Sequence, residues 1–253
     1  MMDIENVSKQ YGKKAVVVDV DLPITEGKLT AFIGPNGAGK STLLSMMSRL
    51  IDKDAGEIYL DGDEVKSWKQ NELAKKLSIL KQANSVSLKI TVRELVAFGR
   101  FPYSKGRLGV DDQAKIDEAL SYLGLVELQD EPIDTLSGGQ LQRAYIAMVF
   151  AQDTDYILLD EPLNNLDMNY AVQMMKTLKR LVEEHGKTVV IVLHDINFAS
   201  SYADEIVAMK DGKIFCRGVT DDVIQKDVLD SLYEMNIRVC ELEGKRFCLY
   251  FND

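Results

Sequence analysis

Short runs of mainly apolar residues are the clearest pattern along the chain, and three of them predict strands. They cover residues 29–33, 156–159 and 188–193, and each is followed at once by glycine, aspartate or histidine. Runs that are apolar without alternation are typical of strands buried on both faces of a mostly parallel sheet. The sequence therefore predicts an α/β core.

Apolar residues spaced three and four apart predict helices between these strands. Residues 40–50, about 168–184 and most of 71–152 have this spacing. A strand and turn at 57–62 and a hairpin with strands at 205–209 and 213–217 complete the pattern. We expect the α/β core to be interrupted by a helical insert at about 85–150.

Composition and charge exclude several classes of protein. The chain has 253 residues and a net charge of −10, which argues against a protein that binds nucleic acid over a basic face. No apolar run approaches the ~18 residues of a membrane-spanning helix, and the N-terminal residues do not resemble a secretory signal. Three cysteines without close spacing suggest reduced thiols rather than a disulfide framework.

A glycine-rich segment follows the first predicted strand and begins the first predicted helix. It matches the P-loop pattern G-x-x-x-x-G-K-[ST], whose glycines let backbone N–H groups turn toward phosphate oxygens. Lys40 is expected to reach the β- and γ-phosphates, and the Ser41 hydroxyl to bind Mg²⁺. The alternative, a glycine-rich turn without a ligand, is disfavoured by the flanking strand and helix. The predicted phosphate site comprises Gly34, Pro35, Asn36, Gly37, Ala38, Gly39, Lys40, Ser41 and Thr42.

Two carboxylates end the strand predicted at 156–159. Because successive strand residues point to opposite sides, Asp160 and Glu161 are expected to have different roles. Asp160 is placed to hold Mg²⁺, and Glu161 to orient or deprotonate an attacking water. The alternative is a solvated acidic strand end.

The segment Leu-Ser-Gly-Gly-Gln at 136–140 precedes a helix expected from Gln140 to about Gln152. A serine hydroxyl and backbone N–H groups at a helix start form a second phosphate-binding surface. One chain has no use for two such surfaces on one nucleotide, so a second copy is expected to supply the other. By itself the segment fits a helix cap equally well, but the other two motifs favour phosphate binding.

Together these motifs resemble the nucleotide-binding subunit of ATP-binding cassette (ABC) transporters, in the family's order and up to about Thr220. The resemblance implies an α/β P-loop NTPase core of the RecA-like type, with an N-terminal antiparallel β region and an inserted helical subdomain. It also implies an ABC ATPase domain at 1–220, with the helical insert at about 85–150, and a C-terminal extension at 221–253 packed on the core.

The resemblance also implies roles for individual residues. Tyr11 matches the aromatic that stacks on adenine, Gln82 the glutamine that senses Mg²⁺ and the attacking water, Asp167 the D-loop aspartate, and His194 the histidine that contacts the γ-phosphate. Their alternatives are a surface aromatic for Tyr11, a solvated loop residue for Gln82 and a structural histidine for His194. The implied cofactors are ATP and Mg²⁺. The implied metal-binding residues are Ser41, Gln82 and Asp160, and the implied catalytic residues are Glu161, His194 and Gln82.

The family's partners follow from the same resemblance. Two chains would enclose two ATP molecules head to tail, each between the P-loop of one chain and the signature segment of the other. That segment consists of Ser137, Gly138, Gly139 and Gln140. The other implied partners are membrane permease subunits and, indirectly, a siderophore-binding lipoprotein. The resemblance places the chain on the cytoplasmic face of the membrane as a peripheral subunit.

Two segments resemble the iron(III)-siderophore import ATPases in particular. Residues 161–167 read Glu-Pro-Leu-Asn-Asn-Leu-Asp, and residues 91–103 lie where the family contacts its permease, unless they form a plain amphipathic helix. We expect ATP hydrolysis that drives ferric-siderophore import. Alternatives are an import ATPase for haem, cobalamin or a metal ion, a soluble ABC ATPase acting on DNA or ribosomes, and a regulatory nucleotide-binding protein without turnover. The net charge and the single cassette argue against the soluble ATPase, and Glu161 against the regulatory protein.

Overall fold

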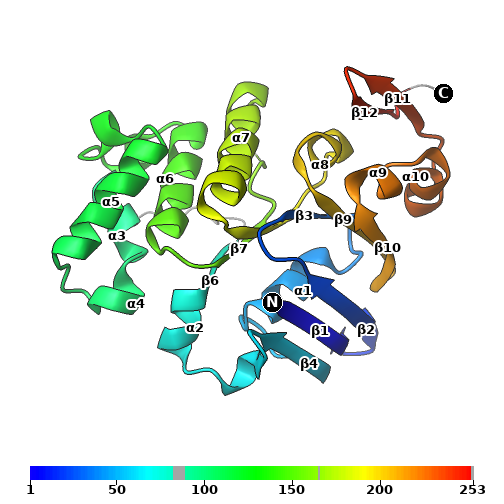
Figure 1. Cartoon of the computed structure of the whole chain (residues 1–253), viewed down its shortest axis with the longest axis horizontal. Coiled ribbons are helices and arrows are strands. Elements are labelled where there is room, and N and C mark those ends of the chain that lie inside the picture. Colours follow the sequence, from blue (N-terminus) through cyan, green and yellow to red (C-terminus); the bar gives the residue numbers. More distant parts are fainter. Residues whose placement is uncertain (82–88, 165, 252–253) are drawn as a thin grey trace. The chain divides into compact units, whose positions relative to one another are not determined.

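The computed structural model describes residues 1–81, 89–164 and 166–251. The chain divides into two units, the first formed by Met1–Trp68 with Lys179–Asp253 and the second by Lys69–Leu178. Figure 1 shows the elements of both units along the chain. The boundary falls within helix α7 (Met168–His185), so each unit contains part of that helix. The boundaries expected from the sequence at about 85–150 and at 221–253 stay predictions.

An antiparallel sheet forms the N-terminal part of the first unit, with the strand order β2-β1-β4-β5. Strand β1 packs alternate side chains into the core, among them Met2 and Ile4, because successive side chains of a strand point to opposite faces. This sheet is the N-terminal antiparallel region that the family resemblance implies. Its strands are β1 (Met2–Tyr11), β2 (Lys14–Ile24), β4 (Ala55–Leu60) and β5 (Asp63–Glu64).

A second sheet of the first unit contains β10, β9, β3 and β8 in that order. Strand β3 runs parallel to both β8 and β9, whereas β10 is antiparallel to β9. Every residue of β3 and β8 is buried, which is why both strands are apolar in the sequence except at Thr30 and Thr188. The bounds are β3 (Leu29–Ile33), β8 (Thr188–Val192), β9 (Glu205–Lys210) and β10 (Lys213–Val219).

Helix α1 (Lys40–Met47) follows β3 and is shorter than the 40–50 predicted from its apolar spacing. The Ser48 hydroxyl donates to the carbonyl oxygens of Leu44 and Ser45, and Arg49 has a left-handed φ of 57°. These two residues end the helix, although Leu50 continues the apolar spacing. The remaining elements of the first unit are η1 (Val65–Ser67), α8 (Ile196–Tyr202), α9 (Thr220–Val223), α10 (Lys226–Tyr233), β11 (Arg238–Leu242) and β12 (Lys245–Leu249).

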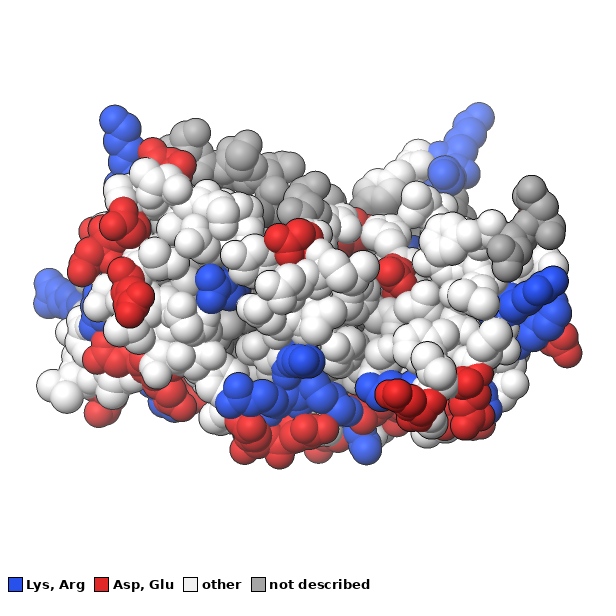
Figure 2. All heavy atoms as spheres, turned by 90° about the horizontal axis from the view of Figure 1, so that it is seen from above, with Lys and Arg blue, Asp and Glu red and all other residues white. Residues whose placement is uncertain are grey.

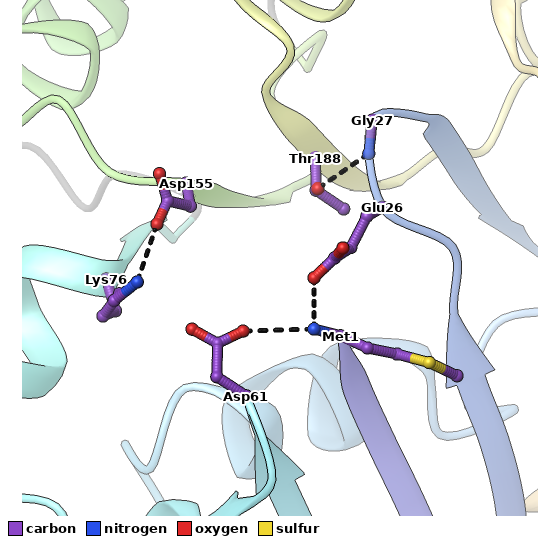
Figure 3. Close-up of polar contacts among 7 residues, drawn as sticks. All are labelled: Met1, Glu26, Gly27, Asp61, Lys76, Asp155 and Thr188. Carbon is purple, nitrogen blue, oxygen red and sulfur yellow. Dashed lines mark hydrogen bonds and ion pairs between the residues drawn. The ribbon is translucent and has the colours of Figure 1, made fainter.

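Figure 3 shows how polar contacts hold the beginning of the first unit together. The amino group of Met1 contacts the carboxylates of Glu26 and Asp61, which follow β2 and β4. The Gly27 N–H donates to the Thr188 hydroxyl at 3.0 Å, joining the turn before β3 to the start of β8. These contacts align strands that are distant in the sequence.

The second unit is mainly helical, as the sequence predicts, and it also contains two parallel strands. The apolar residues that recur at helical spacing form the buried face of α5. Ile116, Ala119 and Leu120 each have at most 1% of their surface exposed. The elements are α2 (Gln70–Lys76), β6 (Leu77–Leu80), α3 (Val92–Phe98), α4 (Phe101–Ser104), α5 (Val110–Tyr122), η2 (Val126–Leu128), η3 (Ile133–Thr135), α6 (Gly138–Ala151) and β7 (Tyr156–Asp160).

Strand β6 lies inside the segment predicted to be mainly helical, so the prediction is wrong at this point. The strand has only four residues, which is too short for its period to be distinguished from that of a helix. It exists because it pairs with β7, and the Ser78 and Thr154 hydroxyls beside this pairing are 2.8 Å apart. An ion pair of 3.0 Å between Lys76 and Asp155 joins the residues just before the two strands (Figure 3).

Charged side chains of both signs are interspersed on the face drawn in Figure 2. Local ion pairs join charged side chains of the first unit, such as Lys53 with Glu57 and Glu64 at 2.9 Å each. Among the residues that the structure describes, no helix is both long and apolar enough to cross a membrane.

Candidate functional site

The glycine-rich segment forms a tight loop between β3 and α1 in the first unit. Gly34, Gly37 and Gly39 have φ values of 136°, 80° and 100°, which side chains rarely tolerate. A Cβ on Gly34 would lie 2.0 Å from the Met209 carbonyl oxygen, and one on Gly39 would lie 2.5 Å from that of Val16. The loop is therefore packed against β9 and β2 so closely that only glycine fits at 34 and 39.

Lys40 is buried at the first position of α1, with 5% of its surface exposed. Its ammonium group donates to the carbonyl oxygens of Gly34 at 2.7 Å and Pro35 at 3.0 Å. The positive charge thus lies inside the loop, next to the N-terminus of a helix, where the helix dipole also favours an anion. The close-packed glycines and this cation fit a chain of phosphates.

His194 lies at the same sheet edge as this loop. Strands β3 and β8 are parallel neighbours, and the Leu193 N–H donates to the Phe32 carbonyl oxygen at 3.0 Å. Gly34 and His194 therefore follow the carboxyl ends of adjacent strands, where ligands of α/β sheets bind. The His194 side chain is exposed, and Asp195 begins helix α8 by accepting from the Asn197 N–H at 2.7 Å.

Tyr11 ends strand β1 in the hairpin with β2, and 53% of its surface is exposed. The Lys9 ammonium lies 5.7 Å from the centre of its ring. Val16 and Val17 of the same hairpin contact the loop at Gly39. The first unit thus gathers the glycine-rich loop, His194 and a hairpin that presents an aromatic ring.

Asp160 and Glu161 lie in the second unit, at the end of β7. Asp160 is 6% exposed, whereas Glu161 has a left-handed φ of 50°, an uncommon conformation for a residue with a side chain. The Asn164 side-chain amide donates to a Glu161 carboxylate oxygen at 2.6 Å. The sequence marked Asn164 only as a feature of a subfamily. An asparagine three residues after the glutamate, in a turn, is the signal that would have indicated this contact.

The signature segment forms the N-terminus of helix α6. The Ser137 hydroxyl accepts from the Gln140 N–H at 3.3 Å, and the Gln140 side chain accepts from the Ser137 N–H at 2.9 Å, which together form a capping box. A Cβ on Gly139 would lie 2.6 Å from the Tyr170 ring. The Gln142 side chain donates to the Pro162 carbonyl oxygen at 2.9 Å, so α6 is joined to the loop that contains Glu161.

Asp167 begins helix α7, and its carboxylate accepts from the Tyr170 N–H at 3.0 Å. The second unit thus gathers Asp160 and Glu161 at one strand end and places the signature segment and Asp167 at the starts of two helices. Gln82 lies outside the described residues.

The oxygen donors suit a magnesium ion better than a transition metal. Among the described residues, no group of three or more His, Cys, Asp and Glu side chains is placed to hold a metal ion. Magnesium is usually held by one or two protein oxygens together with substrate phosphates, rather than by a cage of protein ligands. The Ser41 hydroxyl in the first unit and the Asp160 carboxylate in the second are each an oxygen donor of this kind.

Proteins similar in sequence cover the whole chain. The petrobactin import ATP-binding protein YclP of Bacillus subtilis is 58% identical over 252 residues, which is 100% of both chains. The petrobactin import ATP-binding protein FatE of Bacillus anthracis is 48% identical and covers 94% of this chain and 96% of its own length. The ferric enterobactin transport ATP-binding protein FepC of Escherichia coli is 38% identical, with 94% and 88% covered.

Solved structures and a family model agree with these relatives. A dimeric ATP-binding cassette in a post-hydrolysis state with ADP and Pi is 33% identical, with a TM-score of 0.76 over 87% of this chain and 99% of that one. A nucleotide-free cassette from an ABC transporter is 25% identical, with a TM-score of 0.81 over 91% and 95%. The α/β P-loop NTPase fold predicted from the sequence is therefore confirmed. Because the model of the ABC transporter family matches residues 17–164, the chain belongs to that family and carries its ATPase domain.

Proposed function

We propose that this chain is the ATP-hydrolysing subunit of an importer for iron(III)-siderophores and works with a separate membrane permease. The observation that carries the proposal is the full-length similarity to the petrobactin import protein of Bacillus subtilis. The buried Lys40 inside a loop that only glycine can form supports ATP as the energy source.

The first unit binds the nucleotide. ATP bound there with Mg²⁺ would supply the phosphate bond that is broken, and the metal would neutralise charge on the phosphates. Residues 34–42 hold the phosphate chain, and the Lys40 ammonium exchanges its two carbonyl partners for phosphate oxygens. Tyr11 would stack on the adenine, and Ser41, Asp160 and Gln82 would hold the metal.

Glu161 orients the attacking water and accepts its proton. The hydrogen bond from Asn164 restricts the rotation of this carboxylate, and His194 contacts the γ-phosphate. Because these residues belong to different loops, hydrolysis requires all of them to be assembled around one nucleotide.

A second copy of the chain completes each site. Ser137 and Gly138 are exposed at the N-terminus of the fourteen-residue helix α6, where the first backbone N–H groups have no partner within the helix ladder. Ser137 to Gln140 of one copy cover the nucleotide held by the loop of the other, with Asp167 near the contact. The result is a two-fold symmetric, head-to-tail pair that forms with ATP.

Mixing two inactive variants tests this pair. We expect Lys40→Ala and Ser137→Arg chains each to be nearly inactive, because every pair then has both sites damaged. In an equimolar mixture, half of the pairs are mixed and keep one intact site, so about a quarter of the wild-type rate is expected if the sites act independently. Phosphate release measures the recovery. A mixture no more active than its separate components contradicts the head-to-tail pair.

The helical unit offers a surface for the permease. In α3 and α4, the side chains of Phe98, Phe101 and Tyr103 are 53%, 58% and 38% exposed, within the segment that resembles siderophore importers. Exposed aromatic groups of this kind are enriched at protein interfaces. Through this contact the chain is held at the cytoplasmic face of the membrane as a peripheral subunit, and a siderophore-binding lipoprotein delivers the cargo to the permease.

A gene deletion tests the cargo. The deletion strain is expected to lose growth on a ferric siderophore as sole iron source and to keep growth on excess free iron. A wild-type copy should restore uptake of radiolabelled ferric siderophore, whereas a Lys40→Ala copy should not. Normal uptake of every ferric siderophore, together with failed import of haem or cobalamin, would show that the proposed cargo is wrong. The proposed ATPase role would still stand.

A further inference from the structure

We propose that Tyr233, in the C-terminal extension, is a positioning residue for the phosphate-binding loop. Its hydroxyl oxygen accepts a hydrogen bond from the Gly34 N–H at 3.1 Å, across 199 positions of the sequence. Gly34 is the first residue of the loop, directly after β3. The extension thereby contributes to a site whose recognised residues all precede it.

Three groups contact the backbone of Gly34. Its N–H is bound by Tyr233, its carbonyl oxygen accepts from the Lys40 ammonium at 2.7 Å, and its Cα faces the Met209 carbonyl oxygen. Gly34 is buried, so the loss of the Tyr233 hydroxyl would remove a partner that water does not readily replace. The backbone conformation at Gly34 sets the direction in which the loop leaves the strand, and hence where its later N–H groups point.

Tyr233 is itself held firmly against the core. It is the last residue of α10, in which Leu229 and Leu232 are completely buried. The Lys210 ammonium donates to the Ser231 carbonyl oxygen at 2.7 Å and pairs with Glu234 at 2.8 Å. Lys210 follows Met209 in β9, so the strand that packs on Gly34 also anchors the helix that carries Tyr233.

The rest of the extension is docked in the same unit. The Asn197 side chain, on α8, donates to the Cys248 carbonyl oxygen at 3.2 Å and accepts from its N–H at 2.7 Å. This double contact fixes β12 beside the helix that follows His194. Burial is the main cause that raises the pKa of the Tyr233 hydroxyl, so the group stays neutral at physiological pH.

The inference rests on the proposed nucleotide site and predicts a specific kinetic change. The hydrogen bond shapes the loop whether or not the γ-phosphate is reacting. Its loss therefore weakens the binding of the substrate and the binding of the transition state equally. Such a change raises KM and leaves kcat unaltered. A residue needed only for folding would instead lower the active fraction, and therefore kcat, at an unchanged KM.

Tyr233→Phe tests this role because it removes only the hydroxyl. We expect KM for MgATP and the dissociation constant for MgADP each to rise about three- to tenfold, the usual loss for one hydrogen bond. We expect kcat per folded molecule to change by less than about twofold. Tyr59→Phe is the matched control. It removes the hydroxyl of a half-buried tyrosine in β4 of the same unit and should leave both constants unchanged. Steady-state phosphate release and calorimetric titration give the constants.

The inference is overturned if KM stays at the wild-type value, or if only kcat and the melting temperature fall. Lys40→Ala, measured in parallel, separates this failure from that of the proposed site. If Lys40→Ala loses MgADP binding and Tyr233→Phe does not change it, only the role of Tyr233 is wrong. If Lys40→Ala binds MgADP normally, the proposed site is wrong and the inference falls with it.

Discussion

Replacing Glu161 with Gln is expected to slow ATP hydrolysis about 10²-fold or more, the scale of a lost general base, while ATP binding is retained. The glutamine side chain has the same shape and keeps a carbonyl oxygen that can accept from the Asn164 amide, which lies 2.6 Å from Glu161. The loop after β7 should therefore keep its structure. What the variant loses is the carboxylate that takes a proton from the attacking water.

Two measurements distinguish this effect from a loss of binding. Radiolabelled ATP binding should be close to wild type for Glu161→Gln and weak for Lys40→Ala, whereas phosphate release should be lost in both. Glu127→Gln, an exposed glutamate of the same unit, serves as the control and should hydrolyse ATP at the wild-type rate. Normal turnover by Glu161→Gln would exclude Glu161 as the residue that activates water.

Replacing Arg100 with Ala is expected to lower the free energy of unfolding by about 3–5 kcal/mol, the cost of leaving a buried charge without its partner. Arg100 is 6% exposed, and its guanidinium binds the Asp112 carboxylate at 3.0 Å and the Ala151 carbonyl oxygen at 2.8 Å. Arg100 directly precedes α4, and its side chain thus connects α5 with the end of α6. Although Arg100 lies within the segment that resembles permease-contacting sequences, its burial makes it a structural residue of the helical unit.

Urea unfolding followed by circular dichroism measures this loss. The Gly109 N–H and Arg100 together lower the pKa of Asp112, so the stabilisation is present above the ordinary pKa of aspartate. The difference between wild type and Arg100→Ala should therefore shrink as the pH falls through the lowered pKa of Asp112. Protonation of this carboxyl removes the charge that the variant leaves unpaired.

Arg93→Ala is the matched control for Arg100→Ala. Its ion pair with Asp117, at 2.6 Å, joins side chains that are 31% and 61% exposed. Exposed pairs of this kind contribute only about 0–1 kcal/mol because water screens them. Equal losses of stability in the two variants would show that burial of the Arg100 pair is not what stabilises the helical unit.

Strands buried on both faces were the elements that the sequence predicted best. The bounds of β3 agree with the predicted run, and those of β7 and β8 differ from it by one residue at the carboxyl end. Both faces of such a strand are covered, so nearly all of its residues are apolar. The strand can therefore be recognised from a short segment of sequence. Strand β6 was not predicted because its four residues form a strand only through pairing with β7.

The sequence by itself determined the family, the fold class and the identity of the candidate phosphate-binding and carboxylate residues. These features are encoded in short segments, because a loop that turns through left-handed angles needs glycine at set positions. Only the tertiary structure decided which residues support them: Asn164 at Glu161, Met209 and Tyr233 at Gly34, and Asp112 at Arg100. Apart from Asn164, these partners come from other elements of the chain. A hydrogen bond between two residues 199 positions apart produces no periodic pattern in the sequence from which it could be predicted.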